Sequence, residues 1–320
     1  MTRPSGTLTP DHTSGPPPRR RFLRYALGGV AVVAAAGAAG FELVNHDVLP
    51  GKSELDQLDG ACDVPAPDFT PYAVPGPEYS GTFYSAARQT SVGYTIAYPP
   101  GRRRGDRLPL VIALHGFGGN HTDALSGLSP AQAVALKPGG TPLPPMALVT
   151  ADGGGGYWNP HPGDDPQAML VDELIPLCQR AGLGAGTREI GVLGISMGGY
   201  GAILLAEKYP HLIGAVAAIS PAIWTSYAEA KSANAGAYAS APGFAAGDAV
   251  THAGALAGVP VRVAAGSGDP FYPGVQALAR ALPKSAEVYF GGGCHTGSFF
   301  NSQEPPSLAF LARHLTSRRD

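Results

Sequence analysis

The amino-acid sequence predicts an α/β fold built on a mostly parallel, doubly wound sheet of eight strands with helices on both faces. Short apolar runs alternate with stretches whose apolar residues recur at helical spacing. Helical stretches follow the third expected strand and separate the later ones, as they do where neighbouring strands run parallel. The chain has 320 residues, enough for one large domain of this kind.

The first two expected strands, 82–86 and 92–98, are close in the chain and predict an antiparallel pair. The other six are expected at 108–114, 146–151, 189–195, 215–220, 259–265 and 286–290. Apolar spacing and composition predict helices at 166–180, 198–209, 275–282 and 306–315. Ligands in such sheets collect at the carboxyl ends of the strands, so functional residues are expected at that edge.

The N-terminal part of the chain is expected to stand apart from this domain, which we place at residues 81–316. Residues 1–42 hold a disordered start, then Arg19-Arg20-Arg21-Phe22-Leu23-Arg24, then an uncharged run, 25–41. This pattern resembles a bacterial twin-arginine export signal. An uncleaved anchor remains the alternative, because 17 uncharged residues reach the lower limit for spanning a bilayer. Residues 43–80 form a Pro-rich lead-in.

Charge and cysteine content narrow the function classes. The formal net charge is −2 and charged residues make up only 14% of the chain, which argues against a nucleic-acid partner. The three cysteines, Cys62, Cys178 and Cys294, permit one disulfide in an exported protein and leave all three pairings open. Since no His/Cys cluster has metal-ligand spacing, we expect no metal and no cofactor.

A serine stands in the best-defined chemical motif of the chain. Gly194-Ile195-Ser196-Met197-Gly198 joins the fifth expected strand to an expected helix. Glycines two places on either side of the serine permit the sharp turn that lifts its hydroxyl clear of a sheet. Free backbone N–H groups at the start of the helix face a developing negative charge. We therefore expect Ser196 to be a nucleophile.

A serine nucleophile needs a base, and the base needs an acid that orients it. In this strand–turn–helix setting the chain order is serine, acid, histidine. Asp269 follows the seventh expected strand through a short loop, and His295 follows the eighth through Gly291-Gly292-Gly293-Cys294. Both fall just past the carboxyl end of a strand, so we expect Asp269 as the acid and His295 as the base. Asp248 and His252 are the weaker rivals.

Two backbone N–H groups are expected to stabilise the oxyanion that forms when the serine attacks a carbonyl carbon. One belongs to Met197, the residue after the nucleophile. The other is expected in the loop His115-Gly116-Phe117-Gly118-Gly119-Asn120 after the third strand, where glycines let the backbone face a substrate. We expect the N–H of Phe117 first and that of Gly118 second.

A glycine-rich loop at 152–159 follows the fourth strand and carries Tyr157 and Trp158. It lacks the lysine of a phosphate-binding loop, which argues against nucleotide binding. Both aromatic residues, and Trp224 after the sixth strand, are expected either to contact a substrate or to pack against neighbouring loops. The Ala-, Gly- and Ser-rich insertion 225–254 predicts short helices that cover part of the pocket.

Taken together, these motifs resemble a known family, the "putative esterase" branch of the α/β-hydrolases. That branch is similar to esterase D (S-formylglutathione hydrolase), feruloyl esterases and the antigen 85 mycolyltransferases. The resemblance covers roughly residues 80–316 and implies the α/β-hydrolase fold and a serine hydrolase, but it leaves the substrate open because this fold hosts many chemistries. It rests on the loop 115–120, the turn 194–199, Asp269, and His295 followed by Phe299 and Phe300.

The resemblance implies a serine esterase that cleaves a small-molecule carboxylic ester through an acyl-enzyme, and the twin-arginine pattern predicts that it is exported. Acyl transfer of the antigen 85 type uses the same residues, and a non-catalytic binding protein on this fold is a third alternative. We expect the protein outside the cell or in the cell envelope, with membrane contact only through residues 25–41 if they are retained. If Cys294 carries a free thiol beside His295, its alkylation is expected to slow turnover.

Overall fold

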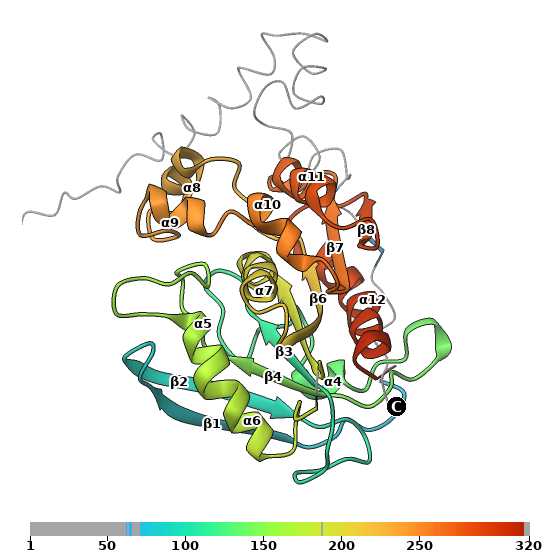
Figure 1. Ribbon diagram of the computed structural model, residues 1–320. Coiled ribbons are helices and arrows are strands. Elements are labelled where there is room, and N and C mark those ends of the chain that lie inside the picture. Colours follow the sequence, from blue (N-terminus) through green and yellow to red (C-terminus); the bar gives the residue numbers. More distant parts are fainter. Residues whose placement is uncertain (1–61, 63, 66–70, 187, 317–320) are drawn as a thin grey trace, which may run out of the picture. The chain divides into compact units, whose positions relative to one another are not determined.

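Eight strands form one sheet at the centre of the computed structural model (Figure 1), which describes residues 62, 64, 65, 71–186 and 188–316. The strands are β1 (Glu78–Ser85), β2 (Thr90–Ala97), β3 (Leu110–Leu114), β4 (Ala147–Ala151), β5 (Ile190–Ile195), β6 (Ile213–Ile219), β7 (Val261–Gly266) and β8 (Glu287–Gly291). Their order is β1-β2-β4-β3-β5-β6-β7-β8. β2 pairs antiparallel with β1 and with β4, and all other neighbours are parallel, which confirms the predicted fold class.

Helices cover both faces of the sheet, because successive residues of a strand point to opposite sides. In β3, Leu110, Ile112 and Leu114 belong to one buried cluster, whereas Val111 and Ala113 belong to the other. The helices are α4 (Pro130–Ala133), α5 (Pro166–Ala168), α6 (Ile175–Arg180), α7 (Met197–Lys208), α8 (Tyr227–Ala233), α9 (Ala241–Ala246), α10 (Ala249–His252), α11 (Tyr272–Ala281) and α12 (Gly297–Thr316). Residues of α7 and α11 pack in the first cluster, and residues of α4 and α12 pack in the second.

The last helix, α12, begins nine residues earlier than the sequence predicts. The sequence predicts a start at Pro306, and proline does suit the first turn of a helix. In the structure Pro305 and Pro306 lie inside α12, although each removes one backbone hydrogen bond. Buried side chains such as Leu308 and Leu311 pack on the sheet and hold the helix together across these positions. As a result, α12 begins two residues after His295.

The insertion after β6 folds into α8, α9 and α10, as predicted, and α10 packs against α7. A side-chain oxygen accepts a backbone N–H bond at the start of each of these helices, from Ser226, Ser240 and Asp248. The expected signal or anchor within 1–42 lies outside the described residues, as does most of the lead-in 43–80. None of the helices within the described ranges combines the length and the apolar character that crossing a bilayer requires.

Candidate active site

Ser196 occupies a sharp turn between β5 and α7. Its backbone has φ 57° and ψ −120°, a conformation that residues other than glycine rarely adopt. A Cβ atom at Gly194 would lie 1.9 Å from the carbonyl oxygen of Gly198, and one at Gly198 would lie 2.0 Å from that of Leu114. The N–H of Ser196 donates to the carbonyl of Ile219 at 2.9 Å and ties the turn to the end of β6. Both glycines are therefore required because no side chain fits there.

Three side chains from distant parts of the chain form a hydrogen-bonded row. Nδ1 of His295 donates to Oδ2 of Asp269 at 2.8 Å, and Nε2 of His295 lies 2.8 Å from Oγ of Ser196. With the proton on Nδ1, Nε2 is free to accept the proton of the serine hydroxyl. The side chain of Asp269 is fully buried, whereas that of His295 is 23% exposed. The structure thus brings together the three side chains that the sequence singles out.

The loops that carry this aspartate and this histidine are joined by backbone hydrogen bonds. The N–H of Ser267 donates to the carbonyl of Gly291 at 2.8 Å, and that of Gly268 donates to the carbonyl of Gly293 at 2.9 Å. The N–H of Phe271 donates to Oδ1 of the aspartate at 2.8 Å. Both loops leave the carboxyl ends of neighbouring parallel strands, β7 and β8, as the strand pattern predicts. This support fixes the acid relative to the base.

The rival acid and base have other places in the structure. Asp248 caps α10, where its Oδ1 accepts the N–H groups of Val250 and Thr251 at 3.0 and 3.3 Å. His252 is the last residue of the same helix. Among the hydrogen bonds between described residues, none joins either side chain to Ser196. The insertion therefore contributes neither the acid nor the base to the hydrogen-bonded group at Ser196.

The loop after β3 runs beside the serine. A Cβ atom at Gly116 would lie 3.6 Å from Cβ of Ser196. A 3.1 Å backbone bond closes a tight turn that begins at Gly116, with Phe117 next and Gly118 at φ 79°. Within the part of the chain that the structure describes, the N–H groups of Phe117, Gly118 and Met197 donate no hydrogen bond. The turn after β3 and the start of α7 both adjoin the serine, so these three N–H groups are the candidates for holding a ligand oxygen.

His115 fixes this loop from behind. The ring is fully buried, and its Nε2 accepts the N–H of Gly153 at 2.8 Å. The ring proton is therefore on Nδ1, which donates to the carbonyl of Gly116 at 2.7 Å. Burial lowers the pKa of His115, which keeps the ring neutral. His115 thus joins the glycine-rich loops after β3 and β4.

Trp158 is a core residue, so the expectation that it contacts a substrate is wrong. Its side chain is fully buried, and its Nε1 donates to the carbonyl of His115 at 3.3 Å. A Cβ atom at Gly153 would lie 2.2 Å from the indole, and one at Gly201 would lie 2.6 Å from it. These glycines leave room for the indole. Packing, the other alternative for this residue, is what the structure shows.

Aromatic rings connect the loop after β3 to His295. Phe271 and Phe300 stand edge-on against His295, with ring centroids 5.1 and 5.0 Å away. The sequence analysis did not single out Phe271. Its position two residues after Asp269 could have indicated it, because a backbone N–H there reaches the carboxylate. The full series, each ring in contact with the next, is Phe117, Tyr157, Trp224, Phe271, His295 and Phe300.

A cavity of about 560 Å³ opens at the serine hydroxyl. Its walls are the turn 116–119, the segment 123–127, His295 and Phe300. No residue of the insertion lines it, so the cover that the sequence predicts is absent from this cavity. Among the described residues, no group of three or more His, Cys, Asp or Glu side chains is arranged to hold a metal ion.

Cys62 and Cys294 form a disulfide, which selects one of the three open pairings. Cys294 therefore has no free thiol, and the condition under which its alkylation was expected to slow turnover is not met. Cys178 is a buried free cysteine, and burial raises the pKa of its thiol to about 12. The disulfide ties the lead-in to the residue directly before His295. The lead-in also packs closely at the neighbouring residue, since a Cβ atom at Gly293 would lie 2.8 Å from Val64.

Comparisons with known proteins agree with this architecture. A ferulic acid esterase structure is similar with a TM-score of 0.63 and 19% identity, over 74% of this chain and 98% of that chain. An S-formylglutathione hydrolase from Agrobacterium tumefaciens is similar with a TM-score of 0.60 and 17% identity, over 76% of this chain and 97% of that chain. A feruloyl esterase module from Clostridium thermocellum is similar with a TM-score of 0.57 and 17% identity, over 79% of this chain and 95% of that chain. No curated protein matches this chain in sequence.

A family model gives the assignment that these distant structures do not. The model described as "Putative esterase" matches residues 85–287, more than half of the chain. The matched region includes the serine turn and Asp269, whereas His295 follows it. The solved structures show the same α/β-hydrolase fold over nearly their full length. The chain therefore belongs to the "Putative esterase" family of the α/β-hydrolases and is a carboxylic-ester hydrolase.

Proposed function

We propose that the protein is an exported serine esterase whose acyl-enzyme forms on Ser196. The row of two 2.8 Å hydrogen bonds through His295 carries this proposal. His295 takes the hydroxyl proton as Ser196 Oγ attacks the ester carbonyl, and it then gives the proton to the leaving alkoxide. Asp269 keeps the proton of the neutral ring on Nδ1 and stabilises the imidazolium. Water, activated by the same ring, releases the acid.

The oxyanion is stabilised by backbone N–H groups from two elements. Met197 supplies one as the first residue of α7, and the turn after β3 supplies the other from Phe117 or Gly118. These three N–H groups donate no hydrogen bond to any described residue, which supports this assignment. Preorganised donors of this type stabilise the transition state by about 3–4 kcal/mol each. His115 keeps the second donor in place.

The substrate is a small ester with a compact, largely apolar group on at least one side. The open cavity has about 560 Å³, and Phe300 and the exposed ring of Phe117 belong to its walls. Its size favours short or medium acyl chains over long lipid chains. The likeness to a ferulic acid esterase and an S-formylglutathione hydrolase is consistent with compact acyl groups.

Export is supported by two features at the N-terminal side of the domain. The Arg19–Arg24 pattern is typical of a twin-arginine signal. The Cys62–Cys294 disulfide is the kind of bond that persists in oxidising compartments. Fractionation of the native host would test this part of the proposal, with the enzyme expected outside the cytoplasm.

Hydrolysis of p-nitrophenyl esters of increasing chain length tests the catalytic part. We expect the wild-type protein to prefer short to medium chains, and Ser196→Ala to lower kcat by at least about a thousandfold. Ser232→Ala is the matched control, since Ser232 is exposed on α8. Equal activity of Ser196→Ala and the wild type would overturn the nucleophile assignment.

A further inference from the structure

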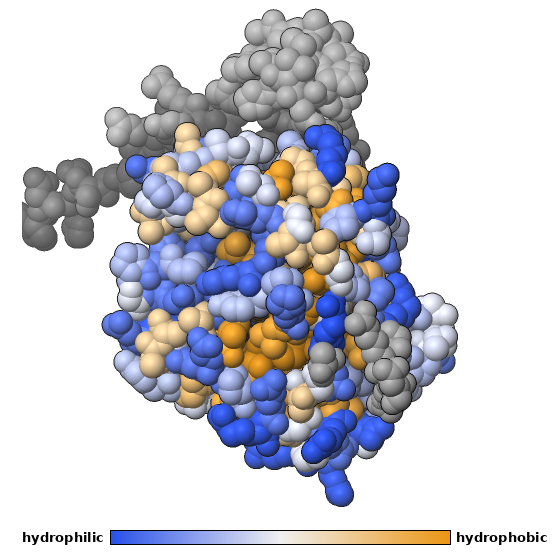
Figure 2. Space-filling view, in the orientation of Figure 1, coloured by the Kyte–Doolittle hydropathy of each residue, from blue (hydrophilic) through white to orange (hydrophobic). Residues whose placement is uncertain are grey.

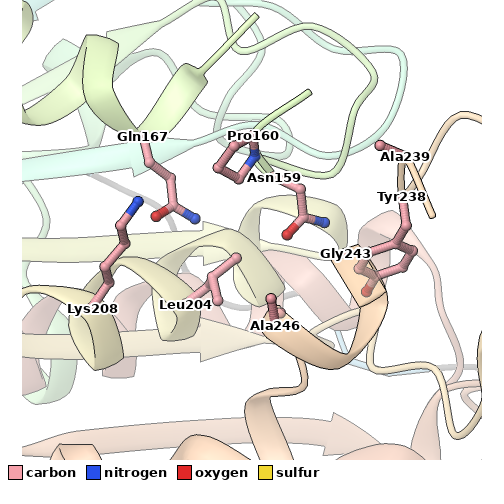
Figure 3. A pocket seen from close by; sticks show the side chains of 10 residues that line it. Asn159, Pro160, Gln167, Leu204, Lys208, Tyr238, Ala239, Gly243 and Ala246 are labelled. Carbon is pink, nitrogen blue, oxygen red and sulfur yellow. The ribbon is translucent and has the colours of Figure 1, made fainter. Parts of the chain in front are cut away.

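Figure 3 shows the side chains that line a second cavity, of about 260 Å³. The two cavities share no lining residue. Three elements form the second one: the chain between β4 and α6, the second half of α7, and the insertion around α9. The residues that matter here are Asn159, Gln167, Leu204, Lys208, Tyr238 and Ala246.

Gln167 presents an unused hydrogen-bond acceptor at this cavity. The side chain is 1% exposed, and its Nε2 donates to the carbonyl of Trp158 at 3.0 Å. Its Oε1 is buried and has no hydrogen-bond partner. A flip of the amide does not solve this, because the carbonyl of Trp158 needs the donor. A buried acceptor in this state is satisfied by a donor from outside the chain, either an ordered water or a group on a ligand.

Lys208 supplies a positive charge at the same cavity. It stands in the last turn of α7, and no ion pair between described residues neutralises it. Burial raises the pKa of the adjacent Glu207 to about 9, so this carboxyl group is uncharged at neutral pH and does not compensate the charge. Figure 3 shows the amide of Gln167 and the amino group of Lys208 reaching toward the same space from different elements.

The remaining walls are mainly apolar. Leu204 and Ala246 belong to the lining, as does Tyr238, and Asn159 already bonds to the carbonyl of Ala237 and to the hydroxyl of Tyr200. Asn159 therefore offers less than Gln167 to a ligand. The cavity has room for about nine waters at liquid density, which corresponds to a molecule of roughly ten non-hydrogen atoms.

We propose that this cavity binds a small amphiphilic acid: a compact apolar body with a hydroxyl group that donates to Gln167 Oε1 and a carboxylate that pairs with Lys208. The occupant joins α7 to α9 and so restricts the motion of the insertion. This site is independent of the ester chemistry at Ser196, and its test uses no measurement of hydrolysis.

Ligand-observed NMR titration of the full chain with 4-hydroxybenzoate tests the proposal. A ligand of this size bound with ordinary efficiency has a Kd of about 1 mM or below. Benzoate lacks the hydroxyl group and 4-hydroxybenzyl alcohol lacks the carboxylate, and each is expected to bind about tenfold more weakly. Hydrogen exchange of residues 238–247 is expected to slow when 4-hydroxybenzoate is present.

Two variants assign the contacts. Lys208→Met is expected to weaken 4-hydroxybenzoate about tenfold and to remove its advantage over the alcohol, whereas the control Lys231→Met on α8 leaves binding unchanged. Gln167→Leu is expected to remove the advantage over benzoate. Lys208 is exposed, so its variant decides the question even if Gln167→Leu fails to fold. No saturable binding near 1 mM, or binding that Lys208→Met leaves unchanged, would overturn the proposal.

Discussion

Removing the Cys62–Cys294 disulfide is expected to lower both the stability of the protein and its turnover. The bond closes a loop with a sequence separation of 232 residues. In the chain-entropy model a loop of this length corresponds to about 5 kcal/mol of stabilisation. Such a loss is a large share of the roughly 5–15 kcal/mol that stabilises a domain. For a domain of this size it corresponds to a fall in Tm of about 10–20 °C.

The effect on turnover follows from the position of the bond. Cys294 precedes His295 directly, and two backbone hydrogen bonds, at Gly291 and Gly293, hold the loop on its other side. Without the disulfide, the segment between Gly293 and α12 gains freedom, and the imidazole shifts relative to Ser196. A displacement of about 1 Å at a catalytic group lowers the rate by up to about a hundredfold. We expect kcat to fall at least about tenfold while KM changes little.

The assay compares the wild type with the variant Cys62→Ser/Cys294→Ser. Thermal unfolding gives Tm, and p-nitrophenyl acetate hydrolysis well below the lower Tm gives kcat and KM. Cys178→Ala is the control for loss of a thiol, since Cys178 is unpaired and buried in α6. The account of the loop would be refuted if the double variant kept the kcat and the Tm of the wild type.

Two further substitutions probe the active site and a buried acid on α7. Asp269→Asn keeps the shape of the side chain but favours the wrong tautomer of His295, so kcat should fall about 10³–10⁴-fold, measured with the same ester; a loss below tenfold would contradict the role of the carboxylate. Glu207→Gln tests the raised pKa, about 9, of a buried acid. The folded protein keeps the Glu207 proton up to about pH 9, whereas the unfolded chain loses it near pH 4.5. The contribution of this group to stability is therefore complete below about pH 4.5 and is lost as the pH rises through 9, so the free energy of unfolding should fall over this window. Denaturant unfolding at pH 5, 7 and 9 should show a shallower fall in Glu207→Gln than in the wild type or in the exposed control Glu229→Gln, and equal slopes would count against it.

The hydrogen-bonded row could be predicted from the sequence because each member is marked locally. Ser196 lies between glycines at the end of a strand, and Asp269 and His295 follow the last two strands of the sheet. In a parallel sheet these strand ends share one edge, so chain order is enough to bring the three together.

Other features depend on contacts that local patterns do not carry. The pairing of Cys62 with Cys294 requires the path of the lead-in, and three cysteines leave three choices. The burial of Trp158 depends on the space at Gly153 and Gly201, the latter on α7, more than 40 residues after Trp158. The early start of α12 depends on packing against the sheet, which outweighs two prolines.

Covalent labelling tests the central claim most directly. A fluorophosphonate probe reacts with a serine hydroxyl only where a base and an oxyanion site activate it. Mass spectrometry of the labelled, digested protein is expected to show one adduct, on the peptide that contains Ser196, in parallel with complete loss of ester hydrolysis. An adduct on another residue, or full hydrolysis after Ser196 is labelled, would contradict the account.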